Sequence, residues 1–369
     1  MMNISTTKKE LQAAFSKLTK TAQVKSQNPL VNYTYISSGP HGVTLHSTDL
    51  EVGIKTQITA SVNTEGEGLF PTSEVNDIIS VIDEGRVDID IAGPHINIKS
   101  EKGISFDIPT EPFQEYPDIP ENKHENLFTI ETSKLKNIIN SLLYAINAEP
   151  TKPALNGAYF NFDQATIDFV ATDGHRLVKI TKQNETNIQK GFIIPKKYLN
   201  ILNTFLEGQK ETSLIFSEEY VFSNNGKDIF YSKIIDEKFP NYNAVIPLEN
   251  SEKLMAQKTE MLNNIKAASI ATNKNTNQIS LNFSEGKVYF KSVNQPESKT
   301  VHAPVKTAEY TGNELAIGFN ATYLKEAVSK YPSEEVILTF KDANSAVLLL
   351  PEETDQKTII LLMPVRINE

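Results

Sequence analysis

The chain has 369 residues, 39% of them hydrophobic and 22% charged, with a net charge of −10. This composition is typical of a soluble globular protein and excludes the fibrous and disordered classes. The absence of cysteine excludes disulfides and thiolate metal sites, and no apolar run nears the roughly 18 residues needed to cross a bilayer. The first residues lack the apolar core of a secretion signal, so a cytoplasmic protein without a membrane partner is expected.

The negative charge is unevenly spread along the chain. Residues 8–25 hold five lysines and one acid, Glu10, whereas acids gather at 111–125 and 334–353. A net negative charge taken alone argues against a nucleic-acid partner. It does not exclude a surface on which lysine is concentrated locally.

A set of landmarks recurs along the sequence at a step of about 124 residues. The first four are followed 124 positions later by their counterparts: Pro29, Thr48, Asp49 and Pro71, then Pro153, Thr172, Asp173 and Pro195. The pairs Tyr116-Pro117, Phe239-Pro240 and Met363-Pro364 extend the pattern to a third copy. Because the step is about one third of the chain, it predicts three tandem domains, at 1–124, 125–250 and 251–369, and not a solenoid of short units.

Each copy contains two segments with the apolar spacing of a one-faced helix, separated by segments that alternate like strands. In chain order the expected helices are 11–18, 75–82, 135–142, 198–205, 262–269 and 324–331. The fifth is the weakest, with a stripe of Leu262, Ile265 and Ser269. The expected strands include 43–46, 87–91, 166–170, 213–216, 287–290 and 336–340. The predicted fold class is therefore α+β, with two helices packed on antiparallel sheet in each domain.

Five motifs resemble, in order, those of one known family. They are LHSTDLEVGI at 45–54, ATDGHRL at 171–177, FPNYNAVIP at 239–247, GFNATYL at 318–324 and LLMPVR at 361–366. The chain is similar in these motifs, and in its threefold repeat, to the bacterial DNA polymerase III β subunit family of replicative sliding clamps. The resemblance implies three tandem copies of a DNA-clamp domain in a head-to-tail ring homodimer. Sheets would form the outer ring, and twelve helices would line a hole that holds duplex DNA.

Helix dimensions support the need for two chains. Six helices about 10 Å across, side by side, make an axis circle about 19 Å wide and a bore of about 10 Å, too narrow for a duplex of order 20 Å with grooves about 8 Å deep. Twelve helices give a bore of roughly 28 Å. A dimer can therefore encircle DNA, whereas one chain cannot.

Lysines on the predicted helices and loops are the candidate DNA-binding residues. They are Lys9, Lys20, Lys25, Lys134, Lys136, Lys152, Lys196 and Lys197. By resemblance, Lys25 and Lys152 occupy loop positions that face the bore. Such lysines would attract phosphates weakly, without sequence preference and with screening by salt. The alternative is that they are the ordinary solvated faces of helices, although their concentration in an acidic chain favours the DNA interpretation.

The resemblance also implies a pocket that binds short peptides of the replicative polymerase, the clamp loader and other proteins with clamp-binding motifs. The matching positions are Leu155, Thr172, Gly174, His175, Arg176, Leu177, Pro240, Val245, Leu362, Met363, Pro364, Val365 and Arg366. The apolar members would form a floor, with methionine adapting to several ligands. The polar members His175, Arg176 and Arg366 would orient the peptide at the rim. The alternative is that these are ordinary core and chain-end residues.

Two departures from the family pattern affect this expected pocket. Asn243-Ala244 stands where many relatives have arginine, so a rim contact is expected to be missing. The chain also continues past Arg366 as Ile367-Asn368-Glu369, which could alter which peptides enter.

Phe106 and Ile270 match the family's subunit contact, and an apolar pair at a sheet edge is suited to closing a ring. Both residues could equally belong to domain cores.

Enzyme activity is disfavoured by the sequence. Asp173 and His175 could pose as an acid–base or metal pair, but Asp173 has a repeat counterpart in Asp49 and is therefore expected to be structural. The histidines lack the spacing of a zinc site, and no phosphate-binding G-x-x-x-x-G-K-[ST] loop occurs. No cofactor or metal is expected, and another protein must load the ring. A second alternative is a repeat scaffold that binds peptides but never encircles DNA.

Overall fold

The computed structural model describes residues 1–22, 28–120, 126–206, 208–274, 276–284, 286–351 and 357–367. The chain forms two compact units. Unit 1 contains Met1–Lys136 and Lys197–Ile234, and unit 2 contains Asn137–Lys196 and Ile235–Glu369. Among the helices in these described ranges, none has the length and apolar character required to cross a membrane.

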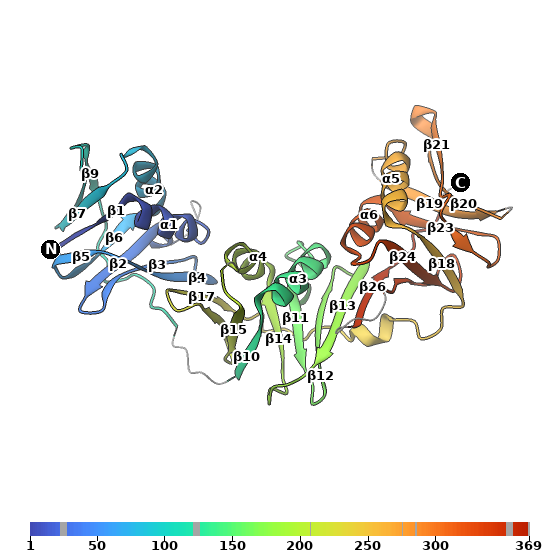
Figure 1. Cartoon of the computed structure of the whole chain (residues 1–369), viewed down its shortest axis with the longest axis horizontal. Helices are drawn as coiled ribbons and strands as arrows, with labels where there is room; N and C mark the ends of the chain where they lie inside the picture. Colours follow the sequence, from blue (N-terminus) through green and yellow to red (C-terminus); the bar gives the residue numbers. More distant parts are fainter. Residues whose placement is uncertain are drawn as a thin grey trace. The chain divides into compact units, whose positions relative to one another are not determined.

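The described strands of unit 1 form two antiparallel sheets (Figure 1). The five-stranded sheet consists, in spatial order, of β5 (Ser61–Thr64), β1 (Met2–Thr7), β7 (Arg86–Ala92), β8 (His95–Ser100) and β9 (Ser105–Pro109). The eight-stranded sheet consists of β10 (Asn126–Glu131), β15 (Glu211–Phe216), β16 (Tyr220–Asn224), β17 (Asp228–Lys233), β4 (Val52–Ile58), β3 (Gly42–Thr48), β2 (Tyr33–Gly39) and β6 (Gly66–Pro71).

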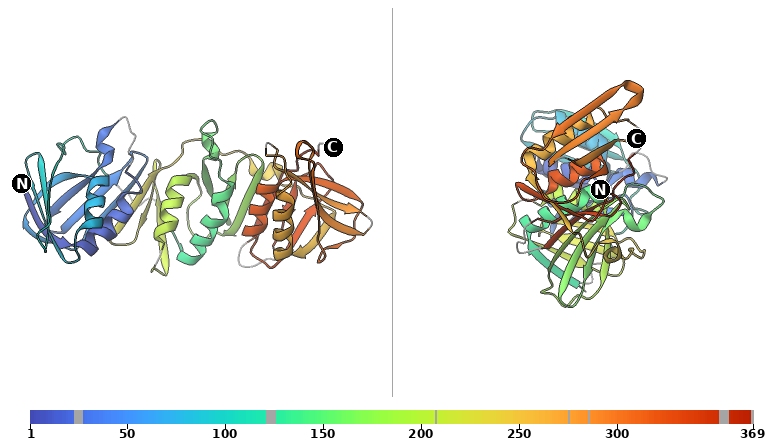
Figure 2. Two further views of the ribbon diagram at one scale, coloured as in Figure 1. Left: turned by 90° about the horizontal axis from the view of Figure 1, so that it is seen from above. Right: turned by 90° about the vertical axis from the view of Figure 1, so that its right-hand side faces the viewer.

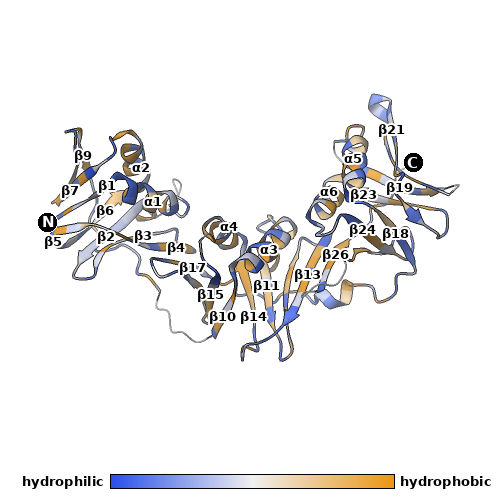
Figure 3. Cartoon of the chain, viewed as in Figure 1, coloured by the Kyte–Doolittle hydropathy of each residue, from blue (hydrophilic) through white to orange (hydrophobic). Residues whose placement is uncertain are grey.

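Helices α1 (Lys8–Leu18) and α2 (Thr72–Val81) lie side by side in unit 1. The hydroxyl of Thr7 accepts a hydrogen bond from the backbone N–H of Glu10 at 3.2 Å, which caps the start of α1. Proline 71 precedes α2, as expected for the first turn of a helix. The predicted apolar stripes of both helices are buried, and each helix also carries hydrophilic residues (Figure 3).

Unit 2 repeats this plan with two further antiparallel sheets among its described strands. The nine-stranded sheet consists of β14 (Gly191–Pro195), β11 (Gly157–Phe162), β12 (Thr166–Thr172), β13 (Arg176–Gln183), β26 (Lys357–Leu362), β25 (Val347–Leu349), β24 (Glu335–Phe340), β18 (Glu252–Gln257) and β22 (Glu309–Tyr310). The four-stranded sheet consists of β21 (Lys299–Pro304), β20 (Lys287–Asn294), β19 (Gln278–Ser284) and β23 (Leu315–Asn320).

Helices α5 (Lys258–Ser269) and α6 (Ala321–Lys330) lie side by side in unit 2 (Figure 2). Two other helices contain a boundary between the units: α3 (Thr132–Leu142) and α4 (Lys196–Phe205). The short 3₁₀ helices are η1 (Pro29–Asn32), η2 (Leu143–Ala145), η3 (Pro153–Leu155), η4 (Tyr242–Val245) and η5 (Gln295–Glu297). The α+β class and the six helices predicted from periodicity are confirmed within the described residues.

The buried face of α5 differs from the prediction. The sequence stripe was Leu262, Ile265 and Ser269, but α5 buries Met261, Ile265 and Ala268. Leu262 is only partly buried. The reason is that α5 packs against both α6 and strands β20 and β21, and these neighbours select a face one residue away from the one that the weak periodicity indicated.

In each unit, one sheet contains strands from two of the predicted domains. In unit 1, β4 pairs with β17 and places Thr56 opposite Asp228. In unit 2, β13 pairs with β26 and places Arg176 opposite Leu362. These backbone ladders join segments far apart in sequence, which explains why the compact units include parts of two sequence repeats.

The repeated Thr-Asp landmark forms the same turn in both copies. The Oδ1 atom of Asp49 accepts hydrogen bonds from the N–H groups of Glu51 and Val52, at 2.9 and 2.7 Å. The Oδ1 atom of Asp173 likewise accepts from the N–H groups of His175 and Arg176, at 2.9 and 3.0 Å. Asp173 is therefore a turn-forming residue, as its repeat counterpart suggested.

Candidate functional site

An apolar cluster lies in unit 2 where β12, β13, β25 and β26 meet residues 239–246. Its buried members are Val170, Leu177, Ile193, Phe239, Tyr242, Leu348 and Leu361. The rings of Tyr159 and Phe239 stack with centroids 4.8 Å apart. Leu155 and Ile246 pack on the cluster as partly buried neighbours. The apolar cluster is a floor suited to nonpolar side chains of a ligand.

The residues predicted for the peptide site belong to the apolar cluster or lie close to its members in sequence. The buried ones are Thr172, Arg176, Leu177 and Leu362. The partly buried ones are Leu155, Pro364 and Val365, and the exposed ones are Gly174, His175, Pro240, Val245, Met363 and Arg366. Val245 and Met363 leave 52% and 42% of their surface in solvent. Two large apolar side chains are therefore available beside a buried apolar floor.

The segment after β26 is held by backbone hydrogen bonds at both ends. The N–H of Met363 donates to the carbonyl of His175, and the N–H of Val365 donates to the carbonyl of Gly318, each at 2.9 Å. A Cβ atom added at Gly318 would lie 2.3 Å from the carbonyl oxygen of Val365, so this close approach requires glycine. These contacts fix residues 363–366 beside the turn that carries His175.

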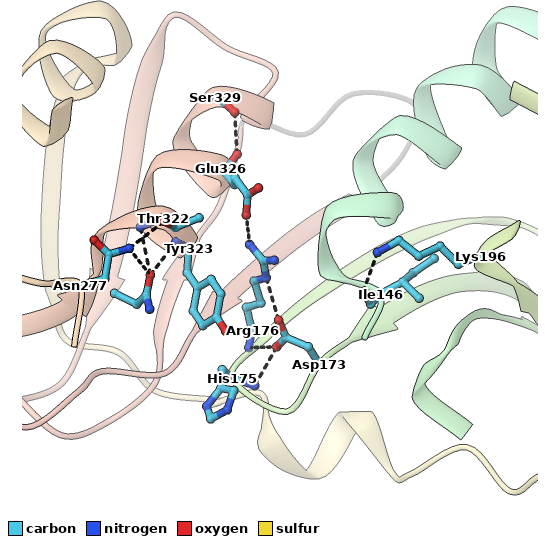
Figure 4. A network of polar contacts seen from close by, with 11 residues as sticks. Ile146, Asp173, His175, Arg176, Lys196, Asn277, Thr322, Tyr323, Glu326 and Ser329 are labelled. Atoms are coloured by element: carbon cyan, nitrogen blue, oxygen red, sulfur yellow. Dashed lines mark hydrogen bonds and ion pairs between the residues drawn. The ribbon is translucent and has the colours of Figure 1, made fainter. Parts of the chain in front are cut away.

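The side chain of Arg176 is buried and fully engaged within unit 2 (Figure 4). Its Nε donates to Oδ2 of Asp173 at 2.9 Å, and its guanidinium is also paired with Glu326 on α6. The guanidinium carbon lies 5.0 Å from the ring centroid of Tyr144 and 4.4 Å from that of Tyr323. Arg176 was expected to orient a peptide at a rim, but its side chain is buried, and its guanidinium links the turn to α6.

The exposed His175 lies at the other side of this network. Its ring stacks on Tyr323, with centroids 6.1 Å apart, and is free to meet a ligand. Lys196 lies nearby and donates from Nζ to the carbonyl of Ile146 at 3.0 Å. Burial, with a smaller contribution from the charge of Arg176, lowers the pKa of Lys196 below its usual range.

A second polar network holds residues 242–245 against β13. Lys179 Nζ lies 2.9 Å from Oδ2 of Asp168, and the hydroxyl of Tyr242 donates to the same oxygen at 2.7 Å. Lys179 also donates to Oδ1 of Asn243 at 3.0 Å. The asparagine that departs from the family pattern thus anchors its segment, which the sequence alone did not indicate.

Seven of the eight predicted DNA-binding lysines lie in the described residues, and they fall into three groups. Lys9, Lys20 and Lys152 are exposed. Lys134 and Lys136 are partly buried, and Lys134 Nζ lies 4.0 Å from Glu131. The ammonium group of Lys196 donates to the carbonyl of Ile146, and that of Lys197 is paired with the buried carboxylate of Asp49. Both ammonium groups therefore have partners within the chain. Lys25 lies outside the described residues.

The two residues predicted for subunit contact are each at the margin of a unit. Phe106 is partly buried on β9, the last strand of the five-stranded sheet. Ile270 caps the C-terminal end of α5 and is 77% exposed. Among the described strands, β9 lies at an edge of its sheet and pairs with β8 alone, and such an edge is prone to pairing with another chain.

The sequence interpretation missed the partners that hold Arg176. Tyr323 lies inside the motif at 318–324, and Glu326 follows it by one helical turn, so both were within reach of a motif search. Tyr144 follows the third helix with no motif of its own, and no local signal indicates its contact with Arg176.

Family models for the DNA polymerase III beta subunit match all three thirds of the chain: the N-terminal domain at residues 2–120, the central domain at 129–241 and the C-terminal domain at 243–366. The chain belongs to the DNA polymerase III beta subunit family. Its α+β, three-domain fold is that of the family.

Similar proteins include beta sliding clamps from two bacteria. The Treponema pallidum protein is 28% identical over 83% of this chain and 84% of its own length. The Rickettsia felis protein is 27% identical over 93% of this chain and 94% of its own length.

Solved structures agree with this assignment. The DNA polymerase III subunit beta of Pseudomonas aeruginosa superposes with a TM-score of 0.93 at 24% identity, over 99% of this chain and 100% of that one. The Bartonella birtlesii DnaN sliding clamp, solved bound to griselimycin, gives a TM-score of 0.93 at 25% identity, with full coverage of both chains. The beta-subunit fold therefore extends over the whole chain.

Proposed function

We propose that this chain is a DNA sliding clamp that encircles duplex DNA and tethers the replicative polymerase and other proteins. The observation that carries the proposal is the ordered match of all three beta-subunit domains along one chain. Members of this family are processivity subunits and not catalysts. The use of the Asp173 carboxylate in turn hydrogen bonds agrees with this assignment. A replication protein of this kind acts in the cytoplasm.

We assign peptide binding to the apolar cluster and its exposed neighbours. A peptide of the polymerase, the clamp loader or another partner would place apolar side chains on the cluster, between Met363 and Val245. His175 and Arg366 are exposed and can orient the polar groups of the peptide. Arg176 acts indirectly, because it holds the turn that carries His175.

We assign subunit closure to β9 with Phe106 on one copy and to the end of α5 with Ile270 on the other. The two patches differ in residues and in structure, so the contact is head-to-tail, and such contacts close into rings when the rotation permits. Each subunit would contribute three domains, at 1–124, 125–250 and 251–369.

The exposed Lys9, Lys20 and Lys152 are the best candidates for direct phosphate contacts. Their attraction is weak, sequence-blind and screened by salt. A closed ring needs no tighter grip, because it leaves the DNA only by opening or by sliding off an end. Lys196 and Lys197 contribute to the positive electrostatic potential and to the stability of the fold, since their ammonium groups already have partners in the chain.

Retention on DNA of different topology tests the proposal. The labelled protein is loaded on nicked circular plasmid with a clamp loader and ATP, and protein comigrating with DNA is measured before and after linearisation. We expect retention on circles, loss on linear DNA, and renewed retention when both ends are blocked by bound protein. Equal retention on circular and open linear DNA would refute encirclement. Peptide binding without retention on circles would favour the scaffold alternative.

A further inference from the structure

Unit 1 repeats the backbone arrangement that carries the proposed peptide site of unit 2. In both copies the threonine hydroxyl of the Thr-Asp turn donates to the carbonyl four residues later. Gly53 follows the turn in unit 1 and lies opposite Tyr231 across β4 and β17. Leu177, 124 residues after Gly53, lies opposite Leu361 across β13 and β26. Tyr231 therefore holds in unit 1 the position that Leu361 holds in the apolar cluster.

A stacked pair of aromatic rings follows the same correspondence. Tyr35 on β2 stacks on Tyr116, with ring centroids 5.7 Å apart and planes inclined by 18°. Tyr159 on β11, 124 residues after Tyr35, stacks on Phe239 with centroids 4.8 Å apart and planes inclined by 8°. Tyr116 and Phe239 each belong to the segment that leads to the next repeat. The two units therefore share this aromatic wall as well as the strand pairing.

The rim of the site is also repeated. The N–H of Lys233 donates to the carbonyl of Glu51 at 2.8 Å. This hydrogen bond corresponds to the one from Met363 to His175 in unit 2. Leu50, next to Glu51 on the turn, leaves 44% of its surface in solvent. The turn of unit 1 therefore presents an exposed apolar side chain, as Met363 does in unit 2.

The floors of the two sites differ, because a ring fills the floor of unit 1. A Cβ atom added at Gly53 would overlap Cζ of Tyr231, so the phenol ring lies directly over the glycine. In unit 2 the corresponding backbone carries the side chain of Leu177. Tyr231 is 3% exposed and packs with Ile215 and Phe222. The chain thus supplies its own occupant for the floor of unit 1.

A buried polar contact fixes this ring. The hydroxyl of Tyr231 lies 2.7 Å from Nε2 of the buried His46. The imidazole meets the ring of Tyr116 edge-on, with centroids 5.6 Å apart, and the Tyr116 hydroxyl donates to the carbonyl of His46 at 3.2 Å. Either polar group would be costly to bury without the other. In unit 2 the position of His46 is taken by Val170, which cannot hold a hydroxyl.

We propose that Tyr231 is the residue that confines peptide binding to unit 2. Its ring, held by His46, occupies the site in unit 1 that corresponds to the apolar cluster, and so excludes a second peptide. Without the ring, unit 1 would combine an apolar floor with the exposed Leu50 at the rim, which are the features that suit the unit 2 site to a peptide. This inference rests on the proposed peptide binding.

The number of peptides bound per chain tests the proposal. Full-length protein is titrated with a fluorescent clamp-binding peptide at protein concentrations above the dissociation constant. We expect one peptide per chain for the wild type and two for Tyr231→Ala. Tyr231→Leu, which introduces the residue type of Leu361 and leaves a smaller void, should also bind two. One peptide per chain in both variants would overturn the proposal.

Two further variants identify the second binding event. Tyr231→Phe keeps the ring and loses only the hydroxyl, so it is the matched control and should bind one peptide. Met363→Ala, added to Tyr231→Leu, should weaken one of the two binding events and leave the other unchanged. Equal weakening of both events would place the second peptide in unit 2 and overturn the proposal.

A small aromatic probe separates this inference from the proposed function. 4-Methylphenol, the tyrosine side chain as a free molecule, should enter the space vacated in Tyr231→Ala and raise its Tm by about 2–4 °C. It should leave the wild type and Tyr231→Phe unchanged. No such rise in Tyr231→Ala would show that the ring closes no pocket. A wild type that binds no peptide, together with a rise in Tyr231→Ala, would refute peptide binding and retain the closed pocket of unit 1.

Discussion

The guanidinium of Arg176 lies on the ring of Tyr323, 4.4 Å from its centroid. The ring centroid of Tyr144 lies 5.0 Å from the guanidinium carbon, and the carboxylates of Asp173 and Glu326 pair with the guanidinium nitrogens. The turn that presents His175 is therefore tied to α6 by a charged, stacked contact. Lysine could not reproduce it, because it lacks the planar fork of arginine.

Replacement of this side chain should destabilise unit 2. Arg176→Ala is expected to lower the free energy of unfolding by about 2–4 kcal/mol, since it leaves the partly buried carboxylate of Asp173 without a cation. Denaturant unfolding followed by circular dichroism measures the change. Arg366→Ala, at an exposed arginine, should stay within about 0.5 kcal/mol of the wild type. Equal losses in the two variants would show that the Arg176 contacts add nothing to stability.

The exposed Met363 should contribute directly to peptide affinity. We expect Met363→Ala to weaken binding of a fluorescent clamp-binding peptide by about 5–30-fold, corresponding to about 1–2 kcal/mol of lost apolar contact. Fluorescence anisotropy measures the affinity. Ile367→Ala removes an apolar side chain of similar exposure beyond the matching motif and serves as control. Unchanged affinity in Met363→Ala would remove this residue from the site.

The buried His46 should make stability depend on pH. Its Nε2 lies 2.7 Å from the hydroxyl of Tyr231, and burial lowers the pKa of His46 to about 3. An unfolded histidine titrates near pH 6.5, so between about pH 6.5 and 3 the unfolded chain binds the extra proton. The contribution of neutral His46 to the free energy of unfolding is therefore complete above pH 6.5. It declines as the pH falls, by up to about 1.4 kcal/mol per pH unit.

The wild type should lose about 2 kcal/mol of its free energy of unfolding between pH 6.5 and 5 through protonation of His46 in the unfolded chain. His46→Gln should not show this loss. Unfolding midpoints at the two pH values measure it, with exposed His41→Gln as control. A wild-type pH dependence that persists in His46→Gln would assign it to other groups.

A charge at the end of α5 should prevent subunit closure. Ile270→Asp places a carboxylate in the proposed apolar contact, where desolvation of an unpaired charge is costly. Light scattering should give about twice 41.2 kDa for the wild type and about 41.2 kDa for the variant. Val81→Asp, at an exposed apolar residue of α2, should leave the dimer intact. A monomeric wild type would refute the ring.

Local patterns were sufficient to predict most elements of the fold. The stripe of Leu11, Ala14, Phe15 and Leu18 predicted α1 because helical periodicity depends only on residues three and four apart. The repetition of Asp49 as Asp173 predicted a structural role for the same reason, since the hydrogen bonds of these two side chains reach only three residues along the chain. The weak stripe of α5 was misplaced because neighbouring elements, and not its own pattern, select the buried face.

The sequence by itself determined the threefold repeat, the α+β class, the helices and the family motifs. Each of these depends on residues close together in the chain, or on such a local pattern returning at a fixed step. Tertiary structure decided that β4 pairs with β17 and that β13 pairs with β26. It also placed Arg176 against Glu326, 150 residues away, and paired Lys197 with Asp49. Such contacts depend on which sheet edges and helix faces meet after folding, and no local spacing encodes that meeting.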